Sequence, residues 1–192
     1  MRGRIRQLAI ILTFVLLATA EVDPLHASTD PVLRKLLKEA IESDAGFEDR
    51  FDAQVWLLDM SRRLETFVQD PQTRIEMLKQ IHYEARRVDI EPELVLAVIE
   101  VESHFDEYAI SVSGARGLMQ VMPFWLDEIG ISDQNLFKIR TNLRMGCTIL
   151  RYYIDMEPHN LSRALARYNG SLGKTVYPDK VVKALLKNWF KQ

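Results

Sequence analysis

The segment Leu94–Ser103 constrains the fold most, because it is apolar on almost every side. Apart from Glu100, Glu102 and Ser103, every residue in this segment is apolar. A helix that is apolar all round is buried in the core of its domain. The preceding residues, Asp89-Ile90-Glu91-Pro92, suit a helix start, since proline is favoured in the first helical turn. The sequence therefore predicts a domain built around one buried helix.

Helical periodicity also dominates the chain before this segment. Three stretches carry apolar residues three or four positions apart: residues 33–41, 51–68 and 75–88. Asp30-Pro31 precedes the first stretch, and Asp70-Pro71 separates the second from the third. We find no segment that alternates apolar and polar residues convincingly over the length of a strand. The predicted fold class is all-α.

The first 20 residues have the layout of a secretory signal peptide. Arg2, Arg4 and Arg6 precede an apolar stretch, and Ala18-Thr19-Ala20 offers a small-x-small cleavage site. A second, less regular site ends at Ala27. The apolar stretch is shorter than the ~20 residues of a spanning helix. We therefore expect cleavage and export to the periplasm, with membrane association through an uncleaved N-terminus as the alternative.

The chain length of 192 residues fits one domain with a small extension. We expect a signal peptide at residues 1–20, alternatively 1–27. A helical extension should follow at residues 28–75, and the main domain at residues 76–192. Residues 28–75 carry no motif that indicates a function. They could bind a protein partner in the cell envelope or simply pack on the main domain.

The charge of the chain excludes one class of partner. The formal net charge is −2, and residues 76–192 carry equal numbers of acidic and basic residues. A nucleic-acid-binding domain has a strongly basic balance, so we expect no nucleic acid partner. Residues 163–191 are locally basic, with Asp179 as their only acid. This end of the chain suits an anionic polymer, or is an ordinary solvated helix face.

Cysteine and histidine usage gives no sign of a metal or redox site. Cys147 is the only cysteine, and it lies in a helical apolar pattern with Leu143 and Leu150. We expect it to be a small buried hydrophobic residue. The histidines lack the spacing of metal ligands: His26, His82, His104 and His159. We therefore expect no metal and no cofactor.

Two carboxylates inside the apolar helix are candidates for chemistry. Residues two positions apart on a helix point about 200° apart, so Glu100 and Glu102 cannot form a pair. Glu102 lies near the C-terminal end of the helix, where burial and the helix dipole both disfavour the anion and raise the carboxyl pKa. A carboxylic acid protonated near neutral pH can act as a general acid. Glu100 is expected to be held by an ion pair or a capping contact.

A second unusual stretch follows at residues 114–123, Gly-Ala-Arg-Gly-Leu-Met-Gln-Val-Met-Pro. Its two glycines, Gly114 and Gly117, indicate a backbone that bends or approaches another group closely. Gln120 lies between apolar residues, so its amide needs a hydrogen-bonding partner in the protein or in a ligand. Met119 and Met122 are expected to contribute in part to the core.

Together with this stretch, three further motifs resemble the catalytic domain of soluble lytic transglycosylases, a family that includes the goose-type lysozymes. Glu102-Ser103-x-Phe105 resembles the catalytic Glu-Ser motif, and residues 114–123 resemble the Gly-Leu-Met-Gln segment. Asn142-x-x-x-Gly146, followed by Leu150 and Tyr152-Tyr153, resembles the third motif. Ala166-Arg167-Tyr168-Asn169-Gly170 resembles the fourth. The resemblance covers about residues 76–192.

The resemblance implies a lysozyme-like helical domain with Glu102 as its sole catalytic acid/base. It also implies that six residues line the glycan groove: Ser103, Ser111, Met119, Gln120, Tyr168 and Asn169. Tyr168 would orient Glu102 through a hydrogen bond. Two departures stand out, since Asp106-Glu107 replaces a frequent Asn-Pro and Arg167 replaces the usual alanine. The second departure leaves the local shape of the groove open.

The implied activity is cleavage of the β-1,4 bond between N-acetylmuramic acid and N-acetylglucosamine. A single acid suffices if the C6 hydroxyl of the muramic acid attacks its own C1 and forms a 1,6-anhydro ring. Three alternatives remain open at this point. A goose-lysozyme-like hydrolase would need a second carboxylate, for which Asp106 is the nearby candidate. A non-catalytic glycan-binding or assembly module would have no use for a buried acid. A plain helical interaction module would have no polar cluster around Glu102.

Overall fold

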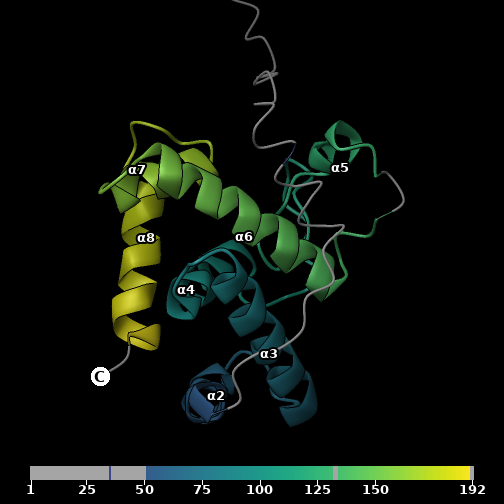
Figure 1. Cartoon of the computed structure of the whole chain (residues 1–192), viewed down its shortest axis with the longest axis vertical. Helices are drawn as coiled ribbons and strands as arrows, with labels where there is room; N and C mark the ends of the chain where they lie inside the picture. Colours follow the sequence, from purple (N-terminus) through teal and green to yellow (C-terminus); the bar gives the residue numbers. More distant parts are fainter. Residues whose placement is uncertain (1–34, 36–50, 132–133, 191–192) are drawn as a thin grey trace, which may run out of the picture.

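The computed structural model describes Lys35, residues 51–131 and residues 134–190 (Figure 1). These residues form seven α-helices and one short π-helix: α2 (Phe51–Leu64), α3 (Pro71–Arg87), α4 (Pro92–Ser103), α5 (Phe124–Glu128), α6 (Ile139–Met156), α7 (Leu161–Tyr168), α8 (Val176–Ala184) and η1 (Leu185–Trp189). Within the described residues the β-structure is limited to isolated bridges that join Arg116 to Ile110 and to Val121. The all-α class is confirmed.

Helix α4 is the centre of the fold, as its composition predicts. All residues from Leu94 to Ile99 are buried, and α4 packs against α3, α8 and η1. In Figure 1 it lies inside the array, between α8 on one side and α3 and α6 on the other. Its N-terminal half fills the core, and its C-terminal end carries Glu102.

The predicted helices before α4 are largely confirmed. Helix α3 begins at Pro71, where the Asp70 carboxylate caps it by accepting a hydrogen bond from the Thr73 amide at 2.7 Å. Helix α2 ends at Leu64, and its buried residues Trp56, Met60 and Leu64 share one core cluster with α4. Helix α3 also runs continuously through the predicted boundary after residue 75. Residues 51–75 therefore pack as part of the same core.

A buried ion pair fastens α3 to α6. Glu84 and Arg144 are almost fully buried, and the Arg144 guanidinium lies 2.8 Å from the Glu84 carboxylate. Arg87 contacts the other Glu84 oxygen at 2.7 Å and also donates to the Thr148 hydroxyl at 2.8 Å. A buried charge is tolerated only when it is paired and hydrogen-bonded. The contact fixes the register of α6 against α3.

Some predictions fall on residues outside the described part of the chain. These are the signal peptide and the helix expected over residues 33–41. Within the described ranges, no helix is both long and apolar enough to cross a membrane.

Candidate active site

The backbone reverses sharply just after Glu102. His104 and Phe105, the two residues after α4, adopt left-handed φ angles of 51° and 65°. Such angles are uncommon for residues with a side chain and persist where the surrounding packing holds them. The Phe105 ring supplies that packing, because it lies 5.1 Å from the Phe67 ring and 5.5 Å from the Trp189 ring. The turn leaves Glu102 at the exposed end of a buried helix.

Glu102 is a partly buried carboxyl held by a tyrosine. The Tyr177 hydroxyl, from the first turn of α8, donates a hydrogen bond to Glu102 Oε1 at 2.6 Å. Burial raises the pKa of Glu102 to about 7, and the bond from Tyr177 only partly offsets that effect. Burial and the nearby Glu102 charge raise the pKa of Tyr177 well above 10, so its hydroxyl remains a donor. The raised pKa expected from the sequence is confirmed.

Glu100 has separate partners on another part of the molecule. Its carboxylate accepts hydrogen bonds from Asn188 Nδ2 at 2.9 and 3.0 Å and from Trp189 Nε1 at 2.6 Å. Glu100 thus anchors the C-terminal helices to α4. The prediction that the two acids of α4 do not pair is confirmed. In place of the ion pair or capping contact expected for Glu100, neutral Asn188 and Trp189 side chains hold its carboxylate.

Glu102 opens onto a pocket of about 290 Å³. Five residues predicted for the site line it: Glu102, Ser111, Gln120, Tyr168 and Asn169. Six others complete the lining: Ser113, Ala115, Val121, Met122, Trp125 and Ile149. Within the described residues, Glu102 is the only carboxylate in this lining. The pocket therefore offers one acid among hydroxyl, amide and apolar groups.

The loop between α4 and α5 forms one wall of the pocket. The Gln120 side-chain amide donates to the carbonyl oxygens of Ala109 and Gly117 at 3.2 and 2.9 Å, which ties two segments of the loop together. The Ser111 hydroxyl accepts a hydrogen bond from the Ala115 amide at 3.0 Å. The partner expected for the Gln120 amide is therefore the loop backbone.

Asn142 of α6 holds this loop in place through hydrogen bonds to its backbone. Its amide oxygen accepts from the Met119 N–H at 2.8 Å, and its amide nitrogen donates to the carbonyls of Arg116 and Leu136 at 2.7 and 2.9 Å. Asn142 is 1% exposed, so these are buried contacts. Gly117 permits them, because a Cβ at that position would lie 2.5 Å from the Asn142 amide nitrogen. Asn142 belongs to the third sequence motif, and it thus fixes the backbone of the second motif, residues 114–123.

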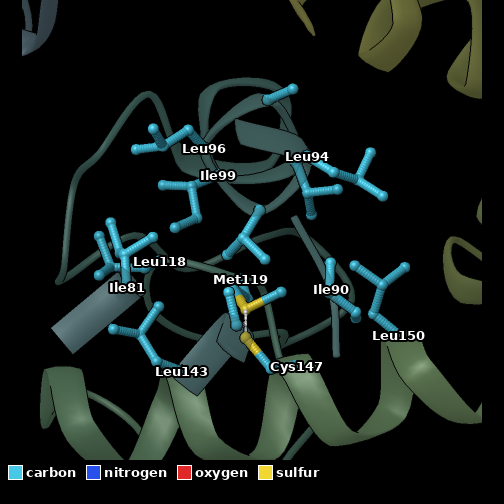
Figure 2. Packing of buried hydrophobic residues seen from close by; sticks show 14 of the residues in the cluster. Ile81, Ile90, Leu94, Leu96, Ile99, Leu118, Met119, Leu143, Cys147 and Leu150 are labelled. Carbon is cyan, nitrogen blue, oxygen red and sulfur yellow. Dashed lines mark hydrogen bonds between the residues drawn. The ribbon is translucent and has the colours of Figure 1, made fainter. Parts of the chain in front are cut away.

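Met119 does not line the pocket, and that prediction is wrong. Its side chain is fully buried and points toward Cys147 of α6, with the two sulfur atoms 3.8 Å apart (Figure 2). Gly146 makes room for it, since a Cβ there would lie 2.5 Å from the Met119 sulfur. Met122, three residues later, lines the pocket instead. The core position predicted for Cys147 is confirmed.

Ser103 does not line the pocket either. Its side chain is buried, and its hydroxyl lies 3.2 Å from the Ile99 carbonyl oxygen and donates to the Leu118 carbonyl oxygen at 2.8 Å. Ser103 therefore joins the end of α4 to the loop. The placement expected from the family resemblance is corrected, because the hydroxyl is engaged with the protein backbone.

Tyr168 lines the pocket but does not hydrogen-bond Glu102. Its hydroxyl donates to the Met119 carbonyl oxygen at 2.7 Å. Burial raises the pKa of Tyr168 well above 10, and the nearby Glu102 charge adds to the shift. The predicted bond to Glu102 is made by Tyr177. Tyr168 instead connects α7 to the same backbone that Asn142 holds.

Sequence reasoning missed Tyr177 and Trp125. Tyr177, Val181 and Ala184 are four and three positions apart, and all three are buried on the inner side of α8. That periodicity could have placed Tyr177 on the core side, but it could not reveal which acid the hydroxyl meets. Trp125 follows the second motif closely and lies in the five-residue helix α5. No periodic signal marks so short a helix.

The side chain of the unusual Arg167 is held by an ion pair. Its guanidinium nitrogen Nε lies 2.5 Å from the Glu157 carboxylate, at the end of α6. Arg163 contacts the same carboxylate at 2.7 Å. Arg167 is absent from the pocket lining. The departure from the family pattern is therefore accommodated by an ion pair outside the site.

The donor set of the pocket does not suit a metal ion. Among the described residues that line it, Glu102 is the only acid, and none is a histidine or a cysteine. Across residues 51–131 and 134–190, no three His, Cys, Asp or Glu side chains gather where they could hold a metal ion.

Comparison with known proteins points to one family. The family model for the transglycosylase SLT domain matches residues 79–188. The chain is 29% identical over 111 residues to membrane-bound lytic murein transglycosylase F of Methylobacillus flagellatus, which covers 54% of this chain and 23% of that protein. It is 30% identical over 102 residues to a transglycosylase of Enterobacteria phage PRD1, covering 50% of this chain and 37% of that protein.

A shorter match has higher identity. The chain is 56% identical over 39 residues to membrane-bound lytic murein transglycosylase C of Actinobacillus pleuropneumoniae, which covers 20% of this chain and 11% of that protein. The matches to these relatives thus span between 11% and 37% of the relatives' own lengths.

Proposed function

Because the chain belongs to the transglycosylase SLT domain family, we propose that it is a lytic transglycosylase that cleaves the glycan strands of peptidoglycan. The bond cleaved joins N-acetylmuramic acid to N-acetylglucosamine, and Glu102 is the acid/base. The observation that carries the proposal is a single carboxyl, with a pKa of about 7, in a pocket that holds no second acid among the described residues.

The first step is protonation of the leaving group. Near neutral pH a large fraction of Glu102 is protonated, because burial has raised its pKa to about 7. Its proton passes to the glycosidic oxygen, and the bond from that oxygen to C1 of the muramic acid breaks. The N-acetylglucosamine leaves as an alcohol, and Glu102 becomes a carboxylate. The Tyr177 hydroxyl, 2.6 Å from Oε1, stabilises that anion.

The second step closes the ring and restores the acid. The Glu102 carboxylate takes the proton of the muramic acid C6 hydroxyl, and the C6 oxygen forms a bond to C1. The product is a 1,6-anhydromuramic acid end, and no water is consumed. One residue therefore serves as acid and then as base. This chemistry needs no cofactor and no metal.

The polar groups of the pocket are suited to hold the sugars. We expect Ser111, Gln120 and Asn169 to bind hydroxyl or acetamido groups, because all three line the pocket beside Glu102. The Gln120 carbonyl oxygen makes no hydrogen bond within the described residues and is available to a ligand. Tyr168 helps to shape the wall through its bond to Met119.

A hydrolase of the same fold is the nearest alternative. It would use a second carboxylate to activate water, and Asp106 was the nearby candidate. Asp106 does not line the pocket, and its carboxylate accepts the Tyr108 N–H at 2.9 Å in an exposed turn. This placement favours the transglycosylase over the hydrolase.

Product analysis tests the proposal directly. We expect purified sacculi digested by the protein to release muropeptides with 1,6-anhydro ends, which mass spectrometry separates from hydrolysis products by the mass of one water. Muropeptides with reducing muramic acid ends would instead support the hydrolase. No release at all would support a binding or assembly module.

We expect Tyr177→Phe to lower the rate about 10- to 100-fold. The substitution removes one hydrogen bond to a charged group, which is worth roughly 1.5–3 kcal/mol. The kcat/KM of the wild type should fall as pH rises through about 7, since Glu102 loses its proton there. Tyr177 stabilises the carboxylate and so lowers this pKa. Its removal should move the fall in kcat/KM to higher pH, measured on soluble glycan strands.

Tyr168→Phe is the matched control for this prediction. Like Tyr177→Phe, it removes one tyrosine hydroxyl. The hydroxyl removed here is the one that donates a hydrogen bond to the Met119 carbonyl oxygen. We expect a lower melting temperature and an unmoved pH profile. If Tyr168→Phe moved the profile and Tyr177→Phe did not, the assignment of the two tyrosines would be reversed.

We place the protein in the cell envelope and, more narrowly, in the periplasm. The N-terminal sequence pattern of a signal peptide supports export. The names of the relatives, membrane-bound lytic murein transglycosylases, support an envelope location. N-terminal sequencing of the exported protein should give a start after Ala20 or Ala27. An intact N-terminus would indicate an anchor.

A further inference from the structure

The outer side of α8 and η1 carries several exposed lysines. On neighbouring α7, Arg163 and Arg167 both form ion pairs with the Glu157 carboxylate. Lys180, Lys183 and Lys187 are exposed and form no ion pair within the described residues. They lie three and four positions apart, so they form one stripe along the helix. This stripe is a concentrated positive charge that the proposed catalytic site does not use.

A shallow groove of about 600 Å³ runs beside the stripe, between α7 and α8. Pro178, Val182 and Leu186 form its apolar part, and Lys183 and Lys187 border it. Leu186 is 63% exposed, although it is a large apolar side chain. The Ser162 hydroxyl and the Asp179 carboxylate complete the lining. The volume lies within the range of pockets that hold small ligands.

The groove begins next to the candidate active site but faces away from it. Tyr177 points inward to Glu102, and Pro178, the next residue, belongs to the groove. In Figure 1, α8 lies at the edge of the molecule with α4 on its inner side. A polymer bound in the pocket could therefore reach the groove with a neighbouring branch, without competing for the same residues.

The chemistry of the groove matches the peptide branches of peptidoglycan. These stem peptides alternate free carboxylates with alanine methyl groups. Lysines supply point charges for the carboxylates, and the apolar part suits the methyl groups. A bilayer surface would instead favour a broad apolar face that inserts between the lipids, whereas here three apolar residues line a shallow groove bordered by Lys183 and Lys187.

We propose that this groove is a second binding site, specific for the anionic stem peptides of peptidoglycan. The proposal rests on the proposed function only in taking peptidoglycan as the substrate. The site holds the protein on the polymer while a glycan strand occupies the pocket. The proposal predicts that the protein binds peptide-bearing strands more tightly than peptide-free strands, and that this difference in binding is lost at high salt.

Binding to sacculi tests the proposal without requiring turnover. The full chain carrying Glu102→Gln is mixed with intact sacculi and, separately, with glycan strands whose stem peptides an amidase has removed. We expect Lys183→Glu with Lys187→Glu to weaken binding to intact sacculi about 3- to 30-fold at low salt, since two exposed ion pairs are lost and reversed. Binding to peptide-free strands should be unchanged. Because no cleavage is measured, this result is independent of the reaction type.

A charge-matched control separates this effect from general repulsion. Arg62→Glu with Lys138→Glu makes the same change in net charge at two exposed positions outside the groove. We expect nearly wild-type binding from this variant, and similar melting temperatures for both. Equal weakening by the two double variants, or equal weakening on both polymers, would overturn the proposal. So would unchanged binding to sacculi with lost binding to phosphatidylglycerol vesicles, which would identify a membrane surface.

Discussion

Glu102→Gln should abolish nearly all cleavage while the protein stays folded. The amide keeps the size of the side chain but has no acidic proton to give to the glycosidic oxygen. General acid catalysis alone is worth about 10²–10⁴-fold, and here the same residue also serves as the base. We expect a loss at or beyond the upper end of that range, measured as release of anhydro-muropeptides. The melting temperature should not fall, because the variant no longer buries an ionisable carboxyl.

Glu100→Gln is the control on the same helix. The glutamine amide has one acceptor oxygen, so it can accept only some of the hydrogen bonds that the carboxylate accepts from Asn188 and Trp189. One buried donor should lose its partner, at a cost of about 1–3 kcal/mol in the free energy of unfolding. We expect a lower melting temperature with less than about a tenfold change in rate. Equal rate losses in the two variants would contradict the assignment of Glu102 as the acid/base.

Asn142→Ala should be the most destabilising substitution near the pocket. It leaves two buried backbone groups without partners, the Met119 N–H and the Leu136 carbonyl, whereas the Arg116 carbonyl keeps the hydrogen bond from the Val121 N–H. Each unpaired buried group costs about 1–3 kcal/mol, so we expect at least about 2 kcal/mol in the free energy of unfolding. In a protein of this size that lowers the melting temperature by about 4–8 °C. The rate should fall as well, since the loop forms one wall of the pocket.

Asn135→Ala supplies the comparison for this prediction. The Asn135 side chain accepts a hydrogen bond from the Phe137 N–H at 2.9 Å in an exposed turn. Water can replace that contact, so the melting temperature should change little. Thermal unfolding followed by circular dichroism distinguishes the two variants. A similar small shift for both would mean that Asn142 does not hold the loop.

The sequence by itself determined the class of the fold and the position of its central helix. The apolar residues of the segment Leu94–Ser103 can be kept from water only inside a core, and α4 lies in the core. Asp70-Pro71 determined where α3 begins, because the cap and the proline act over one turn of chain. The raised pKa of Glu102 also followed from its place in this apolar segment, because burial is what raises it. Such features depend on neighbours within a few residues.

Only the tertiary structure decided which side chains meet at Glu102. Tyr168 and Tyr177 are nine residues apart, and the chain turns between α7 and α8. Each hydroxyl could reach the acid in principle, but the packing of α8 on α4 brings Tyr177 to it. Tyr168 meets the Met119 carbonyl instead. The choice depends on the angles between helices, which no local pattern encodes.

Packing between distant segments also explains where the side chains of Met119 and Ser103 point. Their positions in the motifs suggested contact with a ligand, but their side chains face inward, toward Cys147 and the Leu118 carbonyl. The direction of Met119 is set by Gly146 and Asn142, which belong to a helix more than twenty residues away. The direction of Ser103 is set by the Leu118 carbonyl, fifteen residues away. A motif identifies the residues that build a site. Whether a residue touches the substrate or holds the wall behind it depends on contacts between distant segments, which form only when the chain is folded.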